Sequence, residues 1–145
     1  MSDTPTLTPR LIVSSTANAI EFYRKVFGAT ELERYATPSG QVVHASISIR
    51  GAVVTLADAH DGWYPEPRPE GSPFLLTLAC DDPDGLAKRA EEHGASILIP
   101  VADQFYGRRE GRIRDPFGHL WILSKSVTKM SAEEIQRGVD AFGKS

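Results

Sequence analysis

Gly28-Ala29-Thr30 closes a helical pattern near the start of the chain, and Gly94-Ala95-Ser96 closes a second one 66 residues later (94 − 28 = 66). Two other pairs of segments recur at almost the same offset: Leu11-Ile12-Val13 with Thr77-Leu78-Ala79 (77 − 11 = 66), and Gly51-Ala-Val-Val-Thr-Leu56 with Gly118-His-Leu-Trp-Ile-Leu123 (118 − 51 = 67). Two diverged copies of one unit predict two modules that pack together to bury a core. Because 145 residues suit one domain, the modules are expected to be halves of a single domain.

Each module is predicted to contain a strand, a helix and three more strands. Between Ala19 and Phe27 the apolar side chains recur every three or four residues, which predicts a helix at 16–27 that Gly28 ends. The predicted strands are 7–14, 31–37, 42–50 and 52–57 in the first module and 74–79, 96–101, 106–114 and 119–124 in the second, with a second helix at 82–93. The predicted fold class is therefore α+β, with two βαβββ modules forming a cupped mixed sheet and the helices outside it.

The predicted domain covers residues 7–125. Its repeats are 7–58 and 73–125, and a loop at 59–72 joins them. Residues 126–145 form a tail outside the repeat, in which the capping box Ser131-Ala-Glu-Glu134 predicts a short C-terminal helix.

Composition restricts the classes of partner. A formal net charge of −3 gives no electrostatic reason to expect binding to nucleic acid or to an anionic membrane. No apolar run approaches the ~20 residues of a membrane span, and the first residues lack the pattern of a signal peptide. Cys80, the single cysteine, follows an apolar strand and is expected to be buried. We therefore expect a cytoplasmic protein.

Alternation along the strands predicts a polar-lined face opposite the helices. In strand 42–50, His44 and Ser46 alternate with apolar residues, and Arg112 and Arg114 do the same in strand 106–114. Long loops in compact domains are often functional, and the Pro- and Gly-rich connection carries two adjacent aromatic residues. The predicted ligand-binding residues are His44, Ser46, Trp63, Tyr64, Phe105, Tyr106 and Arg112. Arg112 and Arg114 either pair with Glu110 or hold a ligand carboxylate.

Two stretches resemble the vicinal oxygen chelate superfamily, which includes glyoxalase I, bleomycin-resistance proteins and extradiol dioxygenases. They are Ala19-Ile-Glu-Phe-Tyr-Arg-Lys-Val-Phe-Gly-Ala29 and Asp115-Pro-Phe-Gly-His-Leu-Trp121. Gln104-Phe-Tyr-Gly-Arg108 followed by Asp115-Pro-Phe-Gly-His119 is most similar to the PhnB-like branch. The resemblance implies that paired modules roll their sheets into a cup around a small-molecule ligand, in a homodimer.

The resemblance also locates the usual metal ligands of the family, one on the first and one on the last strand of each module. Counting from the two motifs places them at Thr8, Thr55, Phe74 and Ile122, which are expected to cluster in the cup. A divalent ion needs several His, Glu, Asp or Cys donors at one point, and none of these four residues is a strong donor. We therefore expect no metal and no other cofactor.

Two functions remain open. The first is a non-catalytic protein of the bleomycin-resistance type that binds a planar aromatic drug or metabolite, as in antibiotic resistance. The alternative is a metal-dependent or metal-free enzyme of the same superfamily, a glyoxalase-like lyase, an isomerase or a dioxygenase, with a non-standard site. Its candidate residues would be His44, Asp58 and Glu110. His44 contacts either a ligand or a structural partner. His119 is expected to stabilise the turn before it, and His60 and His93 to lie on the surface.

Overall fold

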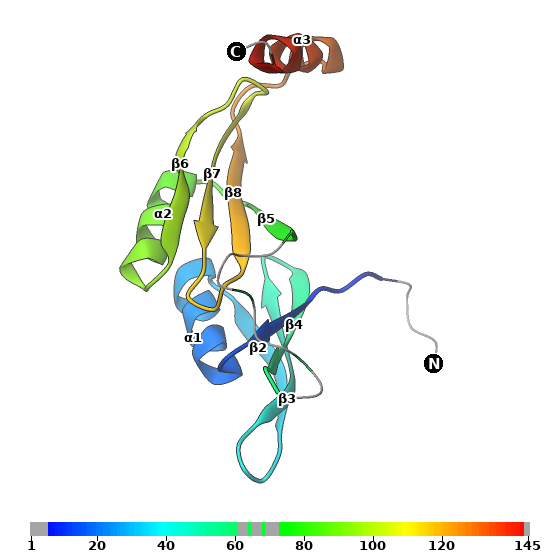
Figure 1. Cartoon of the computed structure of the whole chain (residues 1–145), viewed down its shortest axis with the longest axis vertical. Helices are drawn as coiled ribbons and strands as arrows, with labels where there is room; N and C mark the ends of the chain where they lie inside the picture. Colours follow the sequence, from blue (N-terminus) through cyan, green and yellow to red (C-terminus); the bar gives the residue numbers. More distant parts are fainter. Residues whose placement is uncertain (1–5, 61–63, 65–67, 69–72, 144–145) are drawn as a thin grey trace. The chain divides into compact units, whose positions relative to one another are not determined.

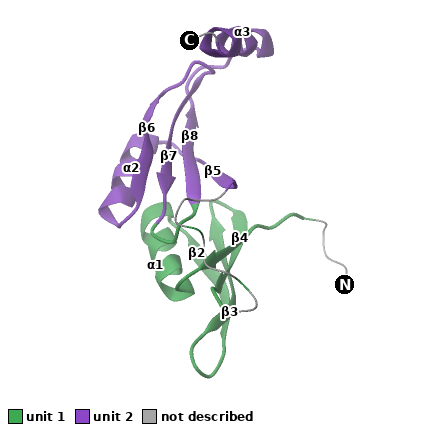
Figure 2. Ribbon diagram, in the orientation of Figure 1, with its two compact units in different colours: residues 1–72, 116–119 green, residues 73–115, 120–145 purple. Residues whose placement is uncertain are grey.

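The structure is a computed structural model that describes residues 6–60, 64, 68 and 73–143. Its elements run in the order β1 (Arg10–Val13), α1 (Thr16–Phe27), β2 (Thr30–Ala36), β3 (Val42–Ile49), β4 (Ala52–Asp58), β5 (Leu75–Ala79), α2 (Pro83–Glu92), β6 (Ser96–Asp103), β7 (Arg108–Arg114), β8 (Leu120–Ser126) and α3 (Ala132–Gly143) (Figure 1). The chain divides into two compact units: unit 1 comprises residues 1–72 and 116–119, and unit 2 comprises 73–115 and 120–145 (Figure 2).

Unit 1 contains a four-stranded mixed sheet in the order β1-β4-β3-β2, in which β1 is parallel to β4 and the other pairs are antiparallel. Helix α1 begins where the Ser15 hydroxyl accepts a hydrogen bond from the Asn18 N–H, and it ends at Gly28 with φ of 72°. Tyr23 is completely buried and stacks on Phe27 at 5.8 Å. Phe117, from the turn before β8, packs 6.4 Å from the Tyr23 ring, so the turn contributes to the core of unit 1.

Unit 2 repeats this arrangement with the order β5-β8-β7-β6, in which β5 is parallel to β8. Helix α2 contacts β6, β7 and β8, and Ala87 and Ala90 are buried on its inner side. Asp115 and Trp121 are both buried, and the indole N–H donates to the carboxylate at 2.9 Å. The predicted α+β class and the double βαβββ order are confirmed.

The register of the strands differs by one residue from the predicted repeat. Leu11 of β1 lies opposite Leu56 of β4, and Leu78 of β5 lies opposite Leu123 of β8. The equivalent residues of β1 and β5, and those of β4 and β8, are therefore separated by the same offset (78 − 11 = 67; 123 − 56 = 67). The predicted offset of 66 for the first strands was therefore wrong. It was read from a short apolar run, whereas burial fixes the register: Leu11 is 2% exposed and Leu78 7%.

The C-terminal helix α3 starts at the predicted capping box. The Glu134 N–H donates to the Ser131 hydroxyl at 3.1 Å, and the Ser131 N–H donates to the Glu134 carboxylate at 3.2 Å. Phe142 stacks on Phe105, with ring centroids 5.9 Å apart. None of the described helices is long and apolar enough to cross a membrane.

Candidate binding site

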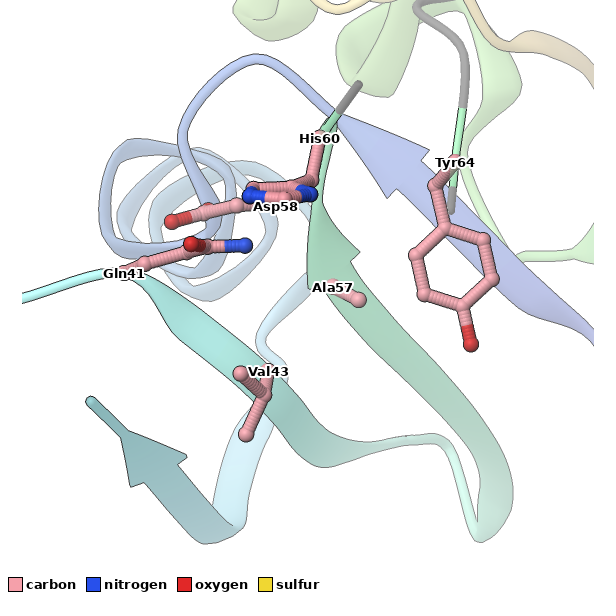
Figure 3. A pocket seen from close by; sticks show the side chains of 6 residues that line it. All are labelled: Gln41, Val43, Ala57, Asp58, His60 and Tyr64. Atoms are coloured by element: carbon pink, nitrogen blue, oxygen red, sulfur yellow. The ribbon is translucent and has the colours of Figure 1, made fainter. Parts of the chain in front are cut away.

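Each unit has a hollow. The first hollow, in unit 1, has a volume of about 310 Å³ and is lined by Gln41, Val43, Ala57, Asp58, His60 and Tyr64. Gln41, Asp58 and His60 gather on one side of it, and the Tyr64 ring lies across from them (Figure 3). The backbones of His60 and Tyr64 hydrogen-bond to each other in both directions, at 2.8 and 2.9 Å, which fixes Tyr64 beside the end of β4.

Arg10 connects this hollow to the sheet. Its guanidinium carbon lies 6.0 Å from the centroid of the Tyr64 ring, a cation–π distance. The Nη2 atom of the same guanidinium is 2.9 Å from Nδ1 of His44. Arg10 therefore holds both a ring of the hollow and a histidine of β3.

His44 forms hydrogen bonds through both ring nitrogens. Because an arginine can only donate, Nδ1 accepts from Arg10, so Nε2 carries the proton and donates to Glu33 at 3.0 Å. The Tyr35 ring stacks on the imidazole at 6.0 Å, and its hydroxyl donates to the same carboxylate. Hydrogen bonds from His44, Tyr35 and Ser46 lower the pKa of Glu33. His44 thus has structural partners in unit 1.

Asp58 also has partners inside the protein. One carboxylate oxygen accepts the Thr16 N–H at 2.7 Å, and the other accepts the Val42 N–H at 2.8 Å. The first of these donors lies at the start of α1, where backbone N–H groups have no partner within the helix. Asp58 therefore joins α1, β3 and β4.

The second hollow, in unit 2, is smaller, about 110 Å³. It is lined by Ile99, Gln104, Tyr106, Glu110, Gly111, Arg112 and Ile122. Cross-strand pairing places Arg112 directly between Ile99 on β6 and Ile122 on β8, so a charged side chain lies between two apolar ones.

Glu110 is the centre of a polar network beside this hollow. It accepts hydrogen bonds from the Tyr106 hydroxyl and, at 2.7 Å, from the Ser124 hydroxyl. The Arg108 Nε donates to the Ser124 oxygen at 2.6 Å and lies 3.9 Å from the carboxylate. Glu110 is therefore satisfied by residues other than Arg112 and Arg114.

Tyr106 is expected to ionise late. Burial, and then its hydrogen bond to Glu110, raise the pKa of Tyr106 from 10.0 to about 12. Because the pKa of Tyr106 is higher in the folded than in the unfolded protein, its neutral phenol stabilises the fold. This stabilisation is complete below pH ~10 and is lost as the pH rises through ~12. Subtracting the phenolate absorbance of Tyr106→Phe from that of the wild type, across a pH titration, should isolate this group. A component that titrates near 10 would contradict the prediction.

The predicted ligand-binding residues fall into two groups. His44, Ser46 and Tyr64 belong to unit 1, and Phe105, Tyr106 and Arg112 to unit 2. Trp63 lies outside the described residues. Tyr64 lines the first hollow, and Tyr106 and Arg112 line the second.

Two of the predicted residues have contacts within their own unit. Ser46 is 5% exposed on β3 and lies opposite Thr55. Phe105 lies edge-on to Tyr106 at 5.1 Å and packs against Phe142 of α3.

The residues at the expected metal positions do not fit a metal. The Thr55 hydroxyl donates to the Pro9 carbonyl at 3.2 Å, and Ile122 is apolar. The corrected register makes Leu75, not Phe74, the counterpart of Thr8 (75 − 8 = 67), and Phe74 precedes β5. Leucine, like phenylalanine, has no donor atom. Within the part of the chain that the structure describes, no three His, Cys, Asp or Glu residues are placed to hold an ion.

The remaining histidines and the cysteine are structural or exposed. The His119 Nε2 donates to the Ile12 carbonyl at 2.8 Å, so this residue connects the turn before β8 to β1. His60 and His93 are exposed, as expected, and Nδ1 of His93 bonds to the carbonyl of Arg89. Cys80 is buried at 7% exposure, as expected.

Several residues of these sites were not found from the sequence. Arg10 belongs to no motif of the sequence, and its charge within the predicted strand 7–14 is the only local signal of it. Glu33 lies on a strand with no buried residue, so its alternation carried no information. Gln104 was noted only as part of a motif, and its side chain donates to the Glu110 carbonyl at 3.4 Å.

Comparison with known proteins agrees with this architecture. The family model described as Glyoxalase/Bleomycin resistance protein/Dioxygenase superfamily matches residues 6–123. An uncharacterised protein of Mycobacterium bovis is 37% identical in an alignment 144 residues long, which covers 96% of this chain and 95% of that one. The chain therefore belongs to this superfamily, and the family inferred from the resemblance is confirmed.

Solved structures share the fold at low sequence identity. A PhnB protein of Bacillus cereus, described as a putative 3-demethylubiquinone-9 3-methyltransferase, is similar with a TM-score of 0.67 and 18% identity over 84% of this chain and 100% of that one. The fosfomycin resistance protein FosX of Listeria monocytogenes, solved with Mn(II) and sulfate, gives a TM-score of 0.63 and 15% identity over 94% and 99%. At these identities the likeness concerns the fold alone.

Proposed function

We propose that this member of the superfamily binds a planar aromatic drug or metabolite without transforming it, as bleomycin-resistance proteins do. The observation that carries the proposal is the set of side chains at the positions that hold metal in other members. Thr55 gives its hydroxyl to a backbone carbonyl, and Ile122 and Leu75 have no donor atoms. Ile122 lines the second hollow together with Tyr106, and Tyr64 lines the first hollow; both rings suit stacking.

The state of the candidate acid/base residues supports binding over catalysis. A general base needs a free lone pair within reach of a substrate proton. In His44 the lone pair of Nδ1 accepts from Arg10, and Asp58 accepts two backbone N–H groups. Glu110 accepts from Tyr106 and Ser124. Each of the three therefore makes hydrogen bonds inside its own unit, as structural residues do.

The proposal includes a homodimer, as the family resemblance implies. Large apolar side chains that are exposed on the strands are the candidates for its interface. Tyr35, Val53 and Ile99 are 56%, 44% and 44% exposed. Light scattering at twice the mass of the 145-residue chain is the expected result, and the monomer mass would remove the dimer from the proposal.

Calorimetry with a neutral planar compound, 2-naphthamide, tests the binding function. We expect saturable binding, and recovery of the compound unchanged after prolonged incubation. Tyr106→Ala, in the second hollow, should weaken binding about fivefold, the equivalent of ~1 kcal/mol for one aromatic contact. Phe142→Ala is the matched control, because that ring is 70% exposed on α3 and lines neither hollow.

Chemical conversion of the compound, or activity that depends on stoichiometric metal retained through dialysis, would favour the enzyme instead. Equal effects of the two aromatic substitutions would remove Tyr106 from the site.

A further inference from the structure

Four charged residues share the face of β7 that bears the second hollow. Alternate residues of a strand point to the same side, so Arg108, Glu110, Arg112 and Arg114 form one row. Their charges sum to +2 (three arginines, one glutamate). Glu110 lies 3.9 Å from Arg108, which leaves the other two arginines without this carboxylate.

Arg112 and Arg114 both have a buried Nε–H with no hydrogen-bond partner among the described residues. Neither takes part in any ion pair of the described chain. A buried donor normally has a partner, and the exceptions call for an explanation. Two positions two residues apart on a strand lie ~7 Å from each other, so the two cations also repel.

A neighbouring arginine shows that this state is not general for the strand. Arg109 points to the opposite face, where it donates to both carboxylate oxygens of Asp84 at 2.7 Å and to Asp103 at 3.1 Å. Arg109, on the helix side, therefore contacts two carboxylates, whereas Arg112 and Arg114 contact none among the residues that the structure describes.

The surroundings of Arg112 suit an anion attached to an apolar body. The second hollow, of about 110 Å³, is several times the ~30 Å³ that a water molecule occupies in the liquid. Ile99 and Ile122 lie opposite Arg112 on the two neighbouring strands, and apolar neighbours strengthen a charge pair by lowering the local dielectric constant. The hydroxyl of Tyr106 is turned to Glu110 on the same wall.

We propose that Arg112 and Arg114 bind the carboxylate of a planar aromatic acid, whose ring lies against Ile99 and Ile122. A guanidinium matches a carboxylate with two parallel hydrogen bonds, which its two terminal Nη groups can donate. This inference rests on the proposed binding function and specifies the chemical class of its ligand.

The test compares two probes of equal shape, 2-naphthoate and neutral 2-naphthamide, by calorimetry. The acid should bind the wild type about tenfold more tightly than the amide. Arg112→Gln and Arg114→Gln should each remove about tenfold of the affinity for the acid and leave that for the amide unchanged. Arg109→Gln is the control from the same strand, and it should leave the preference for the acid intact.

The outcomes separate this inference from the proposed function. If the amide binds as tightly as the acid, the carboxylate site is wrong and the binding function stands. If neither compound binds, both are wrong. Equal losses of acid and amide affinity in the two variants would show a steric role and overturn the charge pairing.

A measurement on the wild type alone covers the case of a variant that does not fold. Added salt should weaken binding of the acid and leave the amide unaffected, because salt screens the charge pair. An acid affinity that is independent of salt would contradict the proposal.

Discussion

Asp58→Ala is expected to lower the free energy of unfolding by about 3 kcal/mol, because two backbone donors lose a charged acceptor. The Thr16 N–H at the start of α1 and the Val42 N–H at the start of β3 both point to this carboxylate, at 2.7 and 2.8 Å. Hydrogen bonds to charged groups contribute more than neutral ones, and both of these are partially buried. Urea denaturation, followed by circular dichroism, measures the change.

Asp82→Ala is the matched control. Asp82 is the N-cap of α2 and also accepts a backbone N–H, that of Gly85 at 3.0 Å, but the contact is exposed and single. Loss of such a cap costs about 1 kcal/mol. Equal losses from the two substitutions would contradict the role assigned to Asp58 as the link between α1, β3 and β4.

The same variant bears on the enzymatic alternative. If Asp58 were a general base, its removal would abolish turnover with little effect on folding. The two contacts with the backbone predict the reverse, a less stable protein whose folded fraction still binds 2-naphthamide. Stability and binding, measured on one sample, therefore distinguish a structural carboxylate from a catalytic one.

Local patterns predicted the elements well. Helix α1 was predicted at 16–27 and is observed there, because its apolar spacing, a polar cap at Ser15 and Gly28 all agree on one structure. The capping box of α3 is similarly local, since both of its hydrogen bonds join Ser131 and Glu134. The strands of the repeat were found because alternation and turn residues recur in both modules.

Long-range pairing could not be read in the same way. His44 and Arg10 are 34 positions apart, and Asp58 and Thr16 are 42 apart, so no local pattern relates them. The strand offset failed for a related reason: a run of three apolar residues fits two registers, and only the burial of Leu11 and Leu78 decides between them. Choosing the partner of Glu110 among the nearby arginines also required the structure, which selects Arg108.

Gly107→Ala should be nearly as damaging as the loss of Asp58, and for a steric reason. Gly107 has φ of +89°, a conformation that costs a residue with a side chain ~1–2 kcal/mol. A Cβ atom there would also lie 2.3 Å from the Thr128 carbonyl oxygen, a fixed backbone atom. The carbonyl of Gly107 accepts the N–H groups of Val127 and Thr128 at 2.9 and 3.0 Å, so the two segments cannot separate without losing these bonds.

A loss of about 3 kcal/mol in unfolding free energy is expected for Gly107→Ala, the sum of conformational strain and overpacking. Gly40→Ala isolates the first term, because Gly40 has φ of +94° and no atom within 4 Å of its Cβ position, and it should lose only ~1 kcal/mol. The displaced turn carries Tyr106, whose hydroxyl would then leave Glu110, so the phenol should titrate closer to 10 in Gly107→Ala and stay near 12 in Gly40→Ala. Equal losses of stability in the two variants would show that the backbone at Thr128 moves away from the new Cβ atom with no loss of stability. The contact between Gly107 and Thr128 would then not position Tyr106.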